Sequence, residues 1–144
     1  MANEMPSSSE FNGLSRKVIE YSEAFAGLVA KAKDGPLVDA DWNTIENLVA
    51  VDTFERVGAF LTPQAEVIAW PKYKHYVSRY ATGSSWEGTL RHVTEQPGRV
   101  ILELEERNSR DGVTDVSNTV TIYEFDEAEK LRHLDVYVMH LEKR

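Results

Sequence analysis

The chain has 144 residues, of which 42% are hydrophobic and 28% charged, and its formal net charge is −8. This length and composition are typical of one globular domain with an apolar core, and no apolar run approaches the roughly 18 residues that cross a bilayer. We therefore expect no membrane partner, and because the negative charge is spread along the chain without a basic patch, we expect no nucleic acid partner either. The absence of cysteine excludes disulfides, iron–sulfur clusters and thiol nucleophiles.

The N-terminal segment, MANEMPSSSEFNG, is polar and has neither the basic start nor the apolar stretch of a signal peptide. We therefore expect residues 1–13 to be a disordered leader, and the cytoplasm is the default location.

Two helices are predicted in the first third of the chain. Apolar residues recur at steps of three and four over residues 14–33, as on one face of a helix. Gly35 and Pro36 then end the pattern, since glycine takes the left-handed conformation at a helix end and proline blocks continuation. A second, short helix is expected within residues 38–50, VDADWNTIENLVA.

The segment TFERVGAF, residues 53–60, has the pattern of a brief strand. Thr62 and Pro63 supply an N-cap and a first-turn proline, so a third helix is expected to start there. Pro71 falls inside that predicted helix and should kink or split it.

After residue 85 the apolar period changes from about 3.6 to about 2, which predicts strands. Short turns separate the alternating segments, so consecutive strands should be antiparallel neighbours. Helices followed by a sheet define an α+β fold with the helices on one face of a strongly bent sheet. The predicted strands are residues 86–96, 99–106, 117–125 and 131–141.

This order of elements, together with the closing segment YEFDEAEKLRHLDVYV, resembles the nuclear-transport-factor-2-like superfamily, which includes ketosteroid isomerases and SnoaL-like polyketide cyclases. The resemblance covers residues 14–141 and implies one domain over residues 14–144. It implies a cone-like fold with about three N-terminal helices packed on the concave face of a strongly bent, mostly antiparallel sheet. Within the superfamily the cone encloses one apolar pocket, where catalysis is usually proton transfer without a cofactor.

The resemblance also implies which side chains face the pocket. Matching the turn FDE at residues 125–127 to the similar turn of ketosteroid isomerases orients both neighbouring strands. His133, Asp135 and Tyr137 then lie on the opposite face, which commonly forms a dimer interface in the superfamily, so a homodimer is expected. The pocket-facing residues would be Ser117, Thr119, Thr121, Tyr123, Leu134, Val136, Val138 and His140.

Glu55 and Arg56 are adjacent in the predicted strand 53–60, so at most one can face the pocket. The resemblance places Glu55 at the position of the isomerase base, and a slip of one residue would place Arg56 there. An inward Glu55 would act as a general base, whereas an inward Arg56 would bind a carboxylate, phenolate or enolate. Both alternatives stay open, and burial of Phe54 on the same face favours Arg56.

Other candidate site residues come from the resemblance and from the dense aromatic content. The catalytic tyrosine of the isomerases falls near Tyr21, and His140 is a candidate acid or base because imidazole titrates near neutrality. The four histidines lack metal-ligand spacing, so neither a metal nor a cofactor is expected. The catalytic candidates are Arg56, Glu55, Tyr21 and His140, and the substrate-binding candidates are Tyr76, Tyr80, Trp86, Thr119, Thr121, Tyr123, Val136 and Val138.

The sequence favours an enzyme: a cofactor-independent lyase, isomerase or dehydratase for a hydrophobic, aromatic and hydroxylated compound, such as a lignin-derived diarylpropane, a steroid or a polyketide. Thr121 stands where the isomerases have a protonated aspartic acid, which argues against a steroid isomerase mechanism. The alternative is a non-catalytic small-molecule-binding or assembly module of the same fold. An ionisable side chain inside the pocket, within reach of a polar partner, distinguishes the enzyme from this module.

Overall fold

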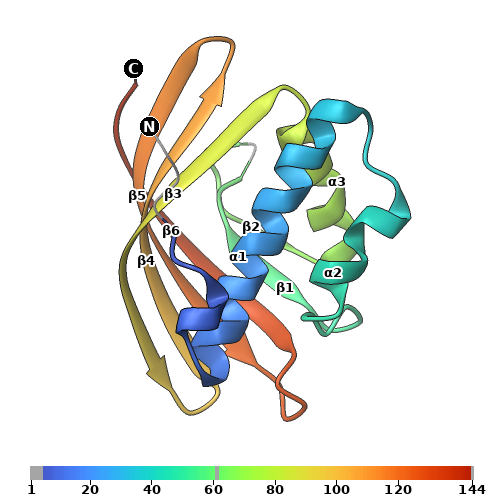
Figure 1. The fold of residues 1–144 in the computed structure, drawn as a ribbon, viewed down its shortest axis with the longest axis vertical. Helices are drawn as coiled ribbons and strands as arrows, with labels where there is room; N and C mark the ends of the chain where they lie inside the picture. Colours follow the sequence, from blue (N-terminus) through green and yellow to red (C-terminus); the bar gives the residue numbers. More distant parts are fainter. Residues whose placement is uncertain (1–4, 61, 144) are drawn as a thin grey trace.

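The structure is a computed structural model that describes residues 5–60 and 62–143, with residues 142 and 143 described as backbone only. Figure 1 shows two layers, a curved sheet on one side and the helices packed on its concave face. The expected α+β architecture, with helices first and the long strands afterwards, is confirmed.

The sheet has six strands in the order β2-β1-β6-β5-β4-β3. The short strand β1 pairs parallel to β6, and every other neighbouring pair is antiparallel. The four long strands follow one another through tight turns, including Asp111-Gly112, where both residues have positive φ. The strands are β1 (Glu55–Gly58), β2 (Glu66–Ile68), β3 (Ser84–Gln96), β4 (Arg99–Arg110), β5 (Val113–Phe125) and β6 (Leu131–Lys143).

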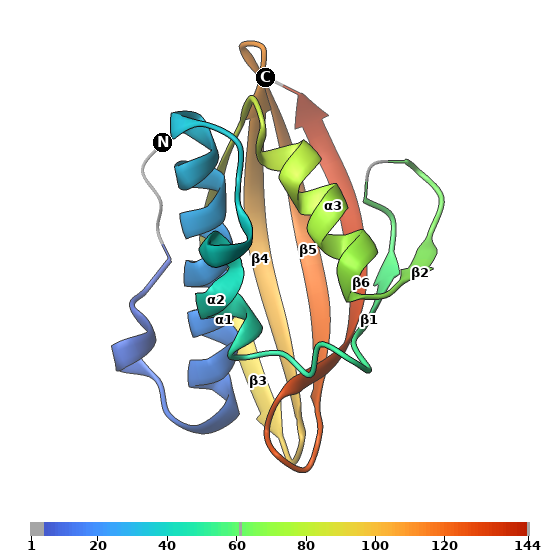
Figure 2. The ribbon, with the colours of Figure 1, turned by 90° about the vertical axis from the view of Figure 1, so that its right-hand side faces the viewer.

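The helices stand in front of the concave face of the sheet. In Figure 2 the long helix α1 lies on the β3 side and α3 lies on the β6 side. The short elements between them connect the first helix to β1. The helices are η1 (Ser8–Glu10), α1 (Gly13–Lys31), η2 (Ala32–Asp34), η3 (Asp39–Trp42), α2 (Asn43–Glu46) and α3 (Trp70–Ala81). None of the helices in the described part of the chain is long and apolar enough to span a membrane.

The third helix begins later than the sequence suggests. Residues 62–64 form bends rather than a first turn, β2 follows, and α3 starts at Trp70 with Pro71 in its first turn. The predicted start at Thr62 and Pro63 and the predicted kink at Pro71 are therefore wrong. Proline lacks an N–H, but the first turn needs none, so Pro71 helps to start this helix instead of breaking it.

The polar N-terminal segment has a defined path from Met5 onward. Ser7 and Glu10 form a capping box around η1, and the side chains of Met5 and Phe11 pack against the core. These two apolar anchors hold a segment that its polarity suggests to be disordered. Residues 1–4 of the expected leader lie outside the described residues.

The core fills the space between α1, α3 and the part of the sheet formed by the first half of β4, the end of β5 and the start of β6. Val18 and Ile19 of α1 and Val77 of α3 are fully buried, and Phe54 is 2% exposed. The Phe54 ring lies 5.0 Å from that of Trp70 and 5.5 Å from that of Tyr73. Because Phe54 immediately precedes β1, its burial directs every second residue of this strand toward the helices.

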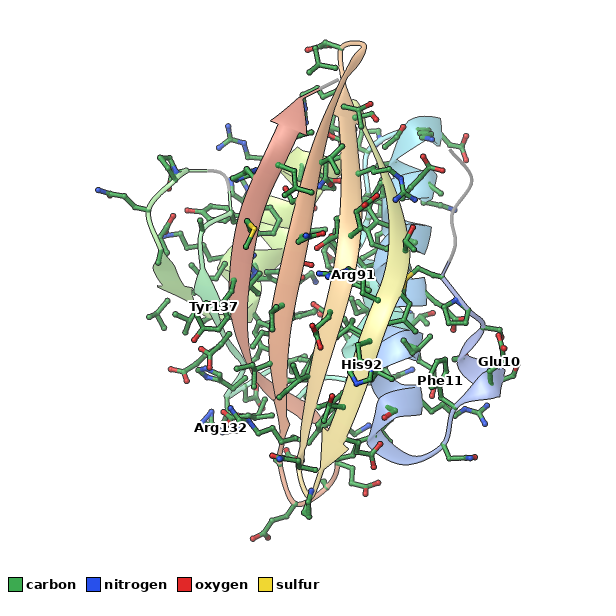
Figure 3. The ribbon with its side chains drawn as sticks, turned by 90° about the vertical axis from the view of Figure 1, so that its left-hand side faces the viewer. Glu10, Phe11, Arg91, His92, Arg132 and Tyr137 are labelled. Carbon is green, nitrogen blue, oxygen red and sulfur yellow. The ribbon has the colours of Figure 1, made fainter. Side chains whose placement is uncertain are left out.

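No helix formed by the described residues covers the convex face of the sheet (Figure 3). Tyr137 of β6 lies on this face, as do Arg91 and His92 of β3, where a bulge interrupts the pairing with β4. Tyr137 and Met139 are 59% and 63% exposed. A homodimer formed through this face stays a prediction.

Gly58 allows β1 to approach β6 closely. Its φ is +143°, a conformation that side chains with a Cβ rarely adopt, and a Cβ placed there would lie 2.7 Å from the backbone oxygen of Val136. That oxygen belongs to a sheet strand and has little freedom to move. Gly58 is therefore required both by its conformation and by the space around it.

We expect Gly58→Ala to destabilise the protein by about 2–3 kcal/mol, since it adds backbone strain to a steric clash. Urea unfolding followed by circular dichroism measures this change. Gly27→Ala is the matched control: nothing lies within 4 Å of its added methyl group, and alanine favours a helix interior. Equal stability of Gly58→Ala and the wild type would contradict this role.

Candidate functional site

A cavity of about 650 Å³ lies between the concave face of the sheet and helices α1 and α3. Its closed end is lined by the buried side chains of Arg56, Tyr21, Tyr73 and Tyr123. At its open end it is lined by exposed residues, among them His140 of β6. The volume is that of a site for a small organic molecule.

Arg56 is the buried cation of this cavity, with 6% of its surface exposed. Its register opposite Leu134 of β6 places it on the concave face. The guanidinium donates hydrogen bonds to the backbone oxygens of Gly58 at 3.3 Å and Ala59 at 3.1 Å. It also lies 4.7 Å from the centre of the Phe60 ring. These contacts hold the charge at the closed end of the cavity.

Tyr21 and Tyr73 form a buried pair of phenols beside Arg56. Their hydroxyl oxygens are 2.6 Å apart, and either one can be the donor. Only one of the two hydroxyl hydrogens is used between them, and within the described part of the chain neither hydroxyl has another hydrogen-bond partner. The pair can therefore donate one hydrogen bond to a ligand.

Burial raises the pKa of Tyr21, Tyr73 and Tyr123 above the ordinary value of 10.0, although the positive charge of Arg56 acts in the opposite direction on all three. Burial likewise raises the pKa of Tyr80, on the opposite wall. All four phenols are therefore protonated at neutral pH. They act as hydrogen-bond donors in the cavity and not as bases.

Glu106 lines the same cavity from β4, which β6 and β5 separate from the strand of Arg56. It follows Leu102 and Leu104 in the alternation of β4, so its side chain points to the concave face. One carboxylate oxygen accepts from the Trp86 indole N–H at 2.6 Å, and the other accepts from the Thr119 hydroxyl at 2.6 Å. Two neutral donors thus orient the carboxylate without neutralising its charge.

Aromatic rings form the wall beside Glu106. Phe25 of α1 stacks on Tyr80 at 6.1 Å and meets Trp86 edge to face at 5.9 Å. Gly88 makes room for the indole, since a Cβ there would lie 2.8 Å from two ring carbons of Trp86. Tyr80 donates its hydroxyl hydrogen to Asn108. A flat apolar ligand would find matching surfaces on this wall.

His140 marks the open end of the cavity, with 70% of its side chain exposed. Its Nδ1 lies 3.4 Å from a carboxylate oxygen of Asp115 and 3.2 Å from the hydroxyl of Ser117. Because both contacts use Nδ1, the second ring nitrogen is available to solvent or to a ligand at the mouth.

Ten of the twelve predicted site residues line the cavity. They come from α1, β1, α3, β3, β5 and β6, and the pocket-facing phase expected for β5 and β6 is the one the structure has. The ten residues are Tyr21, Arg56, Tyr80, Trp86, Thr119, Thr121, Tyr123, Val136, Val138 and His140.

Glu55 points to the opposite face of the sheet, so its interpretation as a base inside the pocket is not supported. Alternation along β1 sends it outward when Arg56 faces in. There it lies 3.1 Å from Nδ1 of His133 and 3.6 Å from the guanidinium of Arg132. It contributes to an ion-pair network behind the cavity.

Tyr76 also lies outside the cavity lining. Its hydroxyl donates to the carboxylate of Glu66 in β2, at 3.0 and 3.1 Å. Tyr76 and Tyr80 are one helical turn apart on α3. The Tyr76 hydroxyl is hydrogen-bonded to β2, whereas the Tyr80 hydroxyl is hydrogen-bonded to Asn108 of β4. The strand β2 was not expected from the sequence, which is why this difference could not be foreseen.

Among the cavity residues that were not predicted from the sequence are Glu106, Asn108, Asp115 and Phe60. The signal for the first two was present, since extending the alternation of Val100, Leu102 and Leu104 by four residues places Glu106 and Asn108 inward. No cluster of three or more potential metal ligands exists among the described residues.

Comparisons with solved structures identify the fold. The chain is similar to an NTF2-like protein of unknown function from Burkholderia pseudomallei K96243, with TM-score 0.67, 10% identity, and coverage of 90% of this chain and 92% of that one. It is similar to a protein assigned as a SnoaL-like polyketide cyclase from Shewanella putrefaciens CN-32, with TM-score 0.64, 9% identity, and coverage of 91% and 82%. A third is Δ5-3-ketosteroid isomerase from Mycobacterium sp., with TM-score 0.60, 14% identity, and coverage of 87% and 98%.

The fold is thus the α+β cone of NTF2-like and SnoaL-like structures, as the sequence resemblance implied. A scan against protein-family models found no match, and a search of curated proteins found none. Since the identities are low, the likeness describes the fold, and function has to be inferred from the cavity.

His133 connects β1 to β6 directly behind Arg56. Its two ring nitrogens lie 3.1 Å from Glu55 and 2.8 Å from Asp135, so both must carry hydrogens for both bonds to form. Burial opposes protonation, but the hydrogen bonds to Asp135 and Glu55 outweigh it and raise the pKa of His133 above 6.5. In its protonated form His133 therefore ties β1, the strand that carries Arg56, to β6.

This arrangement predicts a pH-dependent contribution to stability. A raised folded-state pKa means that the contribution is fully present below pH 6.5, the unfolded value, and is lost as pH rises through the folded value. We expect His133→Gln to reduce the free energy of unfolding more at about pH 6 than at about pH 9. His92→Gln, exposed on the same face, controls for the loss of an imidazole. A reduction independent of pH would refute the linkage.

Proposed function

We propose that the protein is a cofactor-independent enzyme that transfers a proton on a hydrophobic, aromatic and hydroxylated compound, as a lyase, isomerase or dehydratase. The observation that carries this proposal is the presence of a carboxylate, Glu106, and a buried guanidinium, Arg56, in one largely apolar cavity. An apolar cavity with a few convergent polar groups is typical of an enzyme site.

Glu106 is the general base of the proposed reaction. Its carboxylate oxygens each accept one hydrogen bond from a neutral donor, so each retains a lone pair that can take a proton from a ligand. The bonds from Trp86 and Thr119 fix its direction, which a base needs before it can abstract a proton efficiently. Glu106 takes the role that the sequence analysis considered for Glu55.

Arg56 and the pair of Tyr21 and Tyr73 stabilise the oxygen on which negative charge develops. When a C–H next to a carbonyl, or conjugated with it through the ring system, gives its proton to Glu106, the electron pair moves to the carbonyl oxygen, which becomes an enolate. Arg56 supplies a fixed positive charge and the phenol pair supplies one hydrogen-bond donor. The protonated Glu106 then returns the proton to another carbon in an isomerisation, or gives it to a leaving hydroxide.

His140 can supply a second acid or base at the mouth, where Asp115 and Ser117 orient its ring. Thr121 lines the cavity where the resemblance to the isomerases would require an acid. The likeness to a ketosteroid isomerase and to a SnoaL-like cyclase supports proton transfer without a cofactor, whereas Thr121 argues for a substrate other than a steroid.

The competing interpretation is a binding module without catalysis. Such a module needs no ionisable group within reach of its ligand, whereas this cavity contains a base, a cation and phenolic donors. This content favours the enzyme.

Deuterium exchange tests the proposed base. With 6-hydroxy-2-tetralone, an aromatic hydroxylated ketone, in D₂O, we expect the protein to accelerate deuterium incorporation next to the carbonyl, measured by NMR. Glu106→Gln should lower this rate by about 10²- to 10⁴-fold, the usual contribution of a general base. Glu103→Gln, on the same strand but outside the cavity lining, is the matched control and should retain the rate. Binding of the ketone without protein-dependent exchange would instead indicate the non-catalytic module.

A further inference from the structure

We propose that the cavity recognises an aromatic ligand that has two different ends: an acidic oxygen bound by Arg56 at the closed end, and a hydroxyl group that donates to Glu106. The acidic oxygen is a carboxylate, phenolate or enolate. The inference rests on the proposed function in placing the ligand in the same cavity, but it concerns binding and needs no turnover.

Arg56 requires an anion that the described residues do not supply. Its nitrogens contact the backbone oxygens of Gly58 and Ala59, and no described carboxylate lies within the 4.0 Å of an ion pair. Two of its five N–H groups are used in these bonds, and it is only 6% exposed. A buried charge without a counter-ion is costly, and a ligand anion would remove that cost.

Whereas Arg56 requires an anion, Glu106 requires a hydrogen-bond donor on another part of the ligand. Its oxygens accept from Trp86 and Thr119 and have lone pairs left for a further donor. A ligand hydroxyl satisfies this site, whereas a second carboxylate would be repelled by Glu106, by Asp115 at the mouth and by the net charge of −8. The cavity therefore selects against a ligand that is acidic at both ends.

The surfaces between the two charges suit an aromatic body. Leu104, Leu134 and Val136 line the sheet side, and the rings of Phe25 and Trp86 line the helix and β3 side. A cavity of about 650 Å³ has room for two or more fused or linked rings. Arg56 lies at the closed end, so the acidic end of the ligand enters first.

Isothermal titration calorimetry with three naphthalene probes tests this recognition. The probes are 2-naphthoate, 6-hydroxy-2-naphthoate and naphthalene-2,6-dicarboxylate, together with the corresponding biphenyl series, which spans a longer distance. In at least one series we expect the hydroxy acid to bind about 5- to 10-fold more tightly than the monoacid, and the diacid to bind most weakly.

Two variants separate the two ends. Arg56→Met keeps the length of the side chain without its charge, and should weaken binding of all carboxylate probes by about 10- to 100-fold while the preference for the hydroxyl persists. Glu106→Gln should reduce the preference for the hydroxyl, because an amide oxygen is a weaker acceptor than a carboxylate, and should improve binding of the diacid. Arg132→Met and Glu103→Gln, both outside the cavity lining, are the controls and should reproduce the wild-type pattern.

The wild-type comparison needs no variant, so a folding defect of Arg56→Met leaves the proposal testable. Diacid binding as tight as hydroxy-acid binding in both series, or no binding of any probe, would overturn it. Folded Arg56→Met with undiminished affinity for 2-naphthoate would also overturn it. The predicted binding pattern without deuterium exchange would contradict the proposed catalysis alone, whereas Glu106-dependent exchange without the pattern would contradict the recognition alone.

Discussion

The parallel pairing of β1 with β6 determines which of the two charged side chains of β1, Glu55 or Arg56, faces the cavity. In the observed register Arg56 is opposite Leu134 and Glu55 is opposite His133, and a slip of one residue would exchange the faces of the two charged side chains. Several contacts act on this register. The Phe54 ring is buried in front of the sheet, Gly58 fits against the backbone of Val136, and His133 bridges two carboxylates behind it. A four-residue strand is thereby held from both of its faces.

The two charges of the cavity have different structural support. Glu106 is carried by β4, an interior strand paired with long strands on both sides, and its direction follows from regular alternation. Arg56 is carried by a short strand whose other neighbour, β2, has three residues. Glu106 is thus placed by the extensively paired part of the sheet, and Arg56 by a part with fewer paired residues. Because the sheet bends, these separated strands direct their side chains into the same cavity.

Much of the fold could be predicted from the sequence, because long alternating segments and short turns leave few arrangements of a sheet. Which side chains of β5 and β6 face the cavity could be predicted from the turn at residues 125–127. The burial of Phe54 correctly favoured Arg56 over Glu55 as the inward residue of β1. Other features depend on contacts that a local pattern does not contain. The three residues of β2 are too few to show a period, and its Glu66 removes Tyr76 from the cavity. Glu106 was not predicted because a charged residue two positions after Leu104 suggests that the buried, inward-facing set has ended. In the structure the alternation of β4 continues through Glu106.

Trp86 connects the aromatic wall of the cavity to the proposed base, because its indole N–H is donated to Glu106. The other two tryptophans, Trp42 and Trp70, are each 3% exposed and pack edge to face in the core, away from the cavity lining. The protein therefore contains a natural optical reporter. When a ligand binds to Glu106, the electrostatic field at a single indole changes, and the emission of that indole should therefore report whether the cavity is occupied.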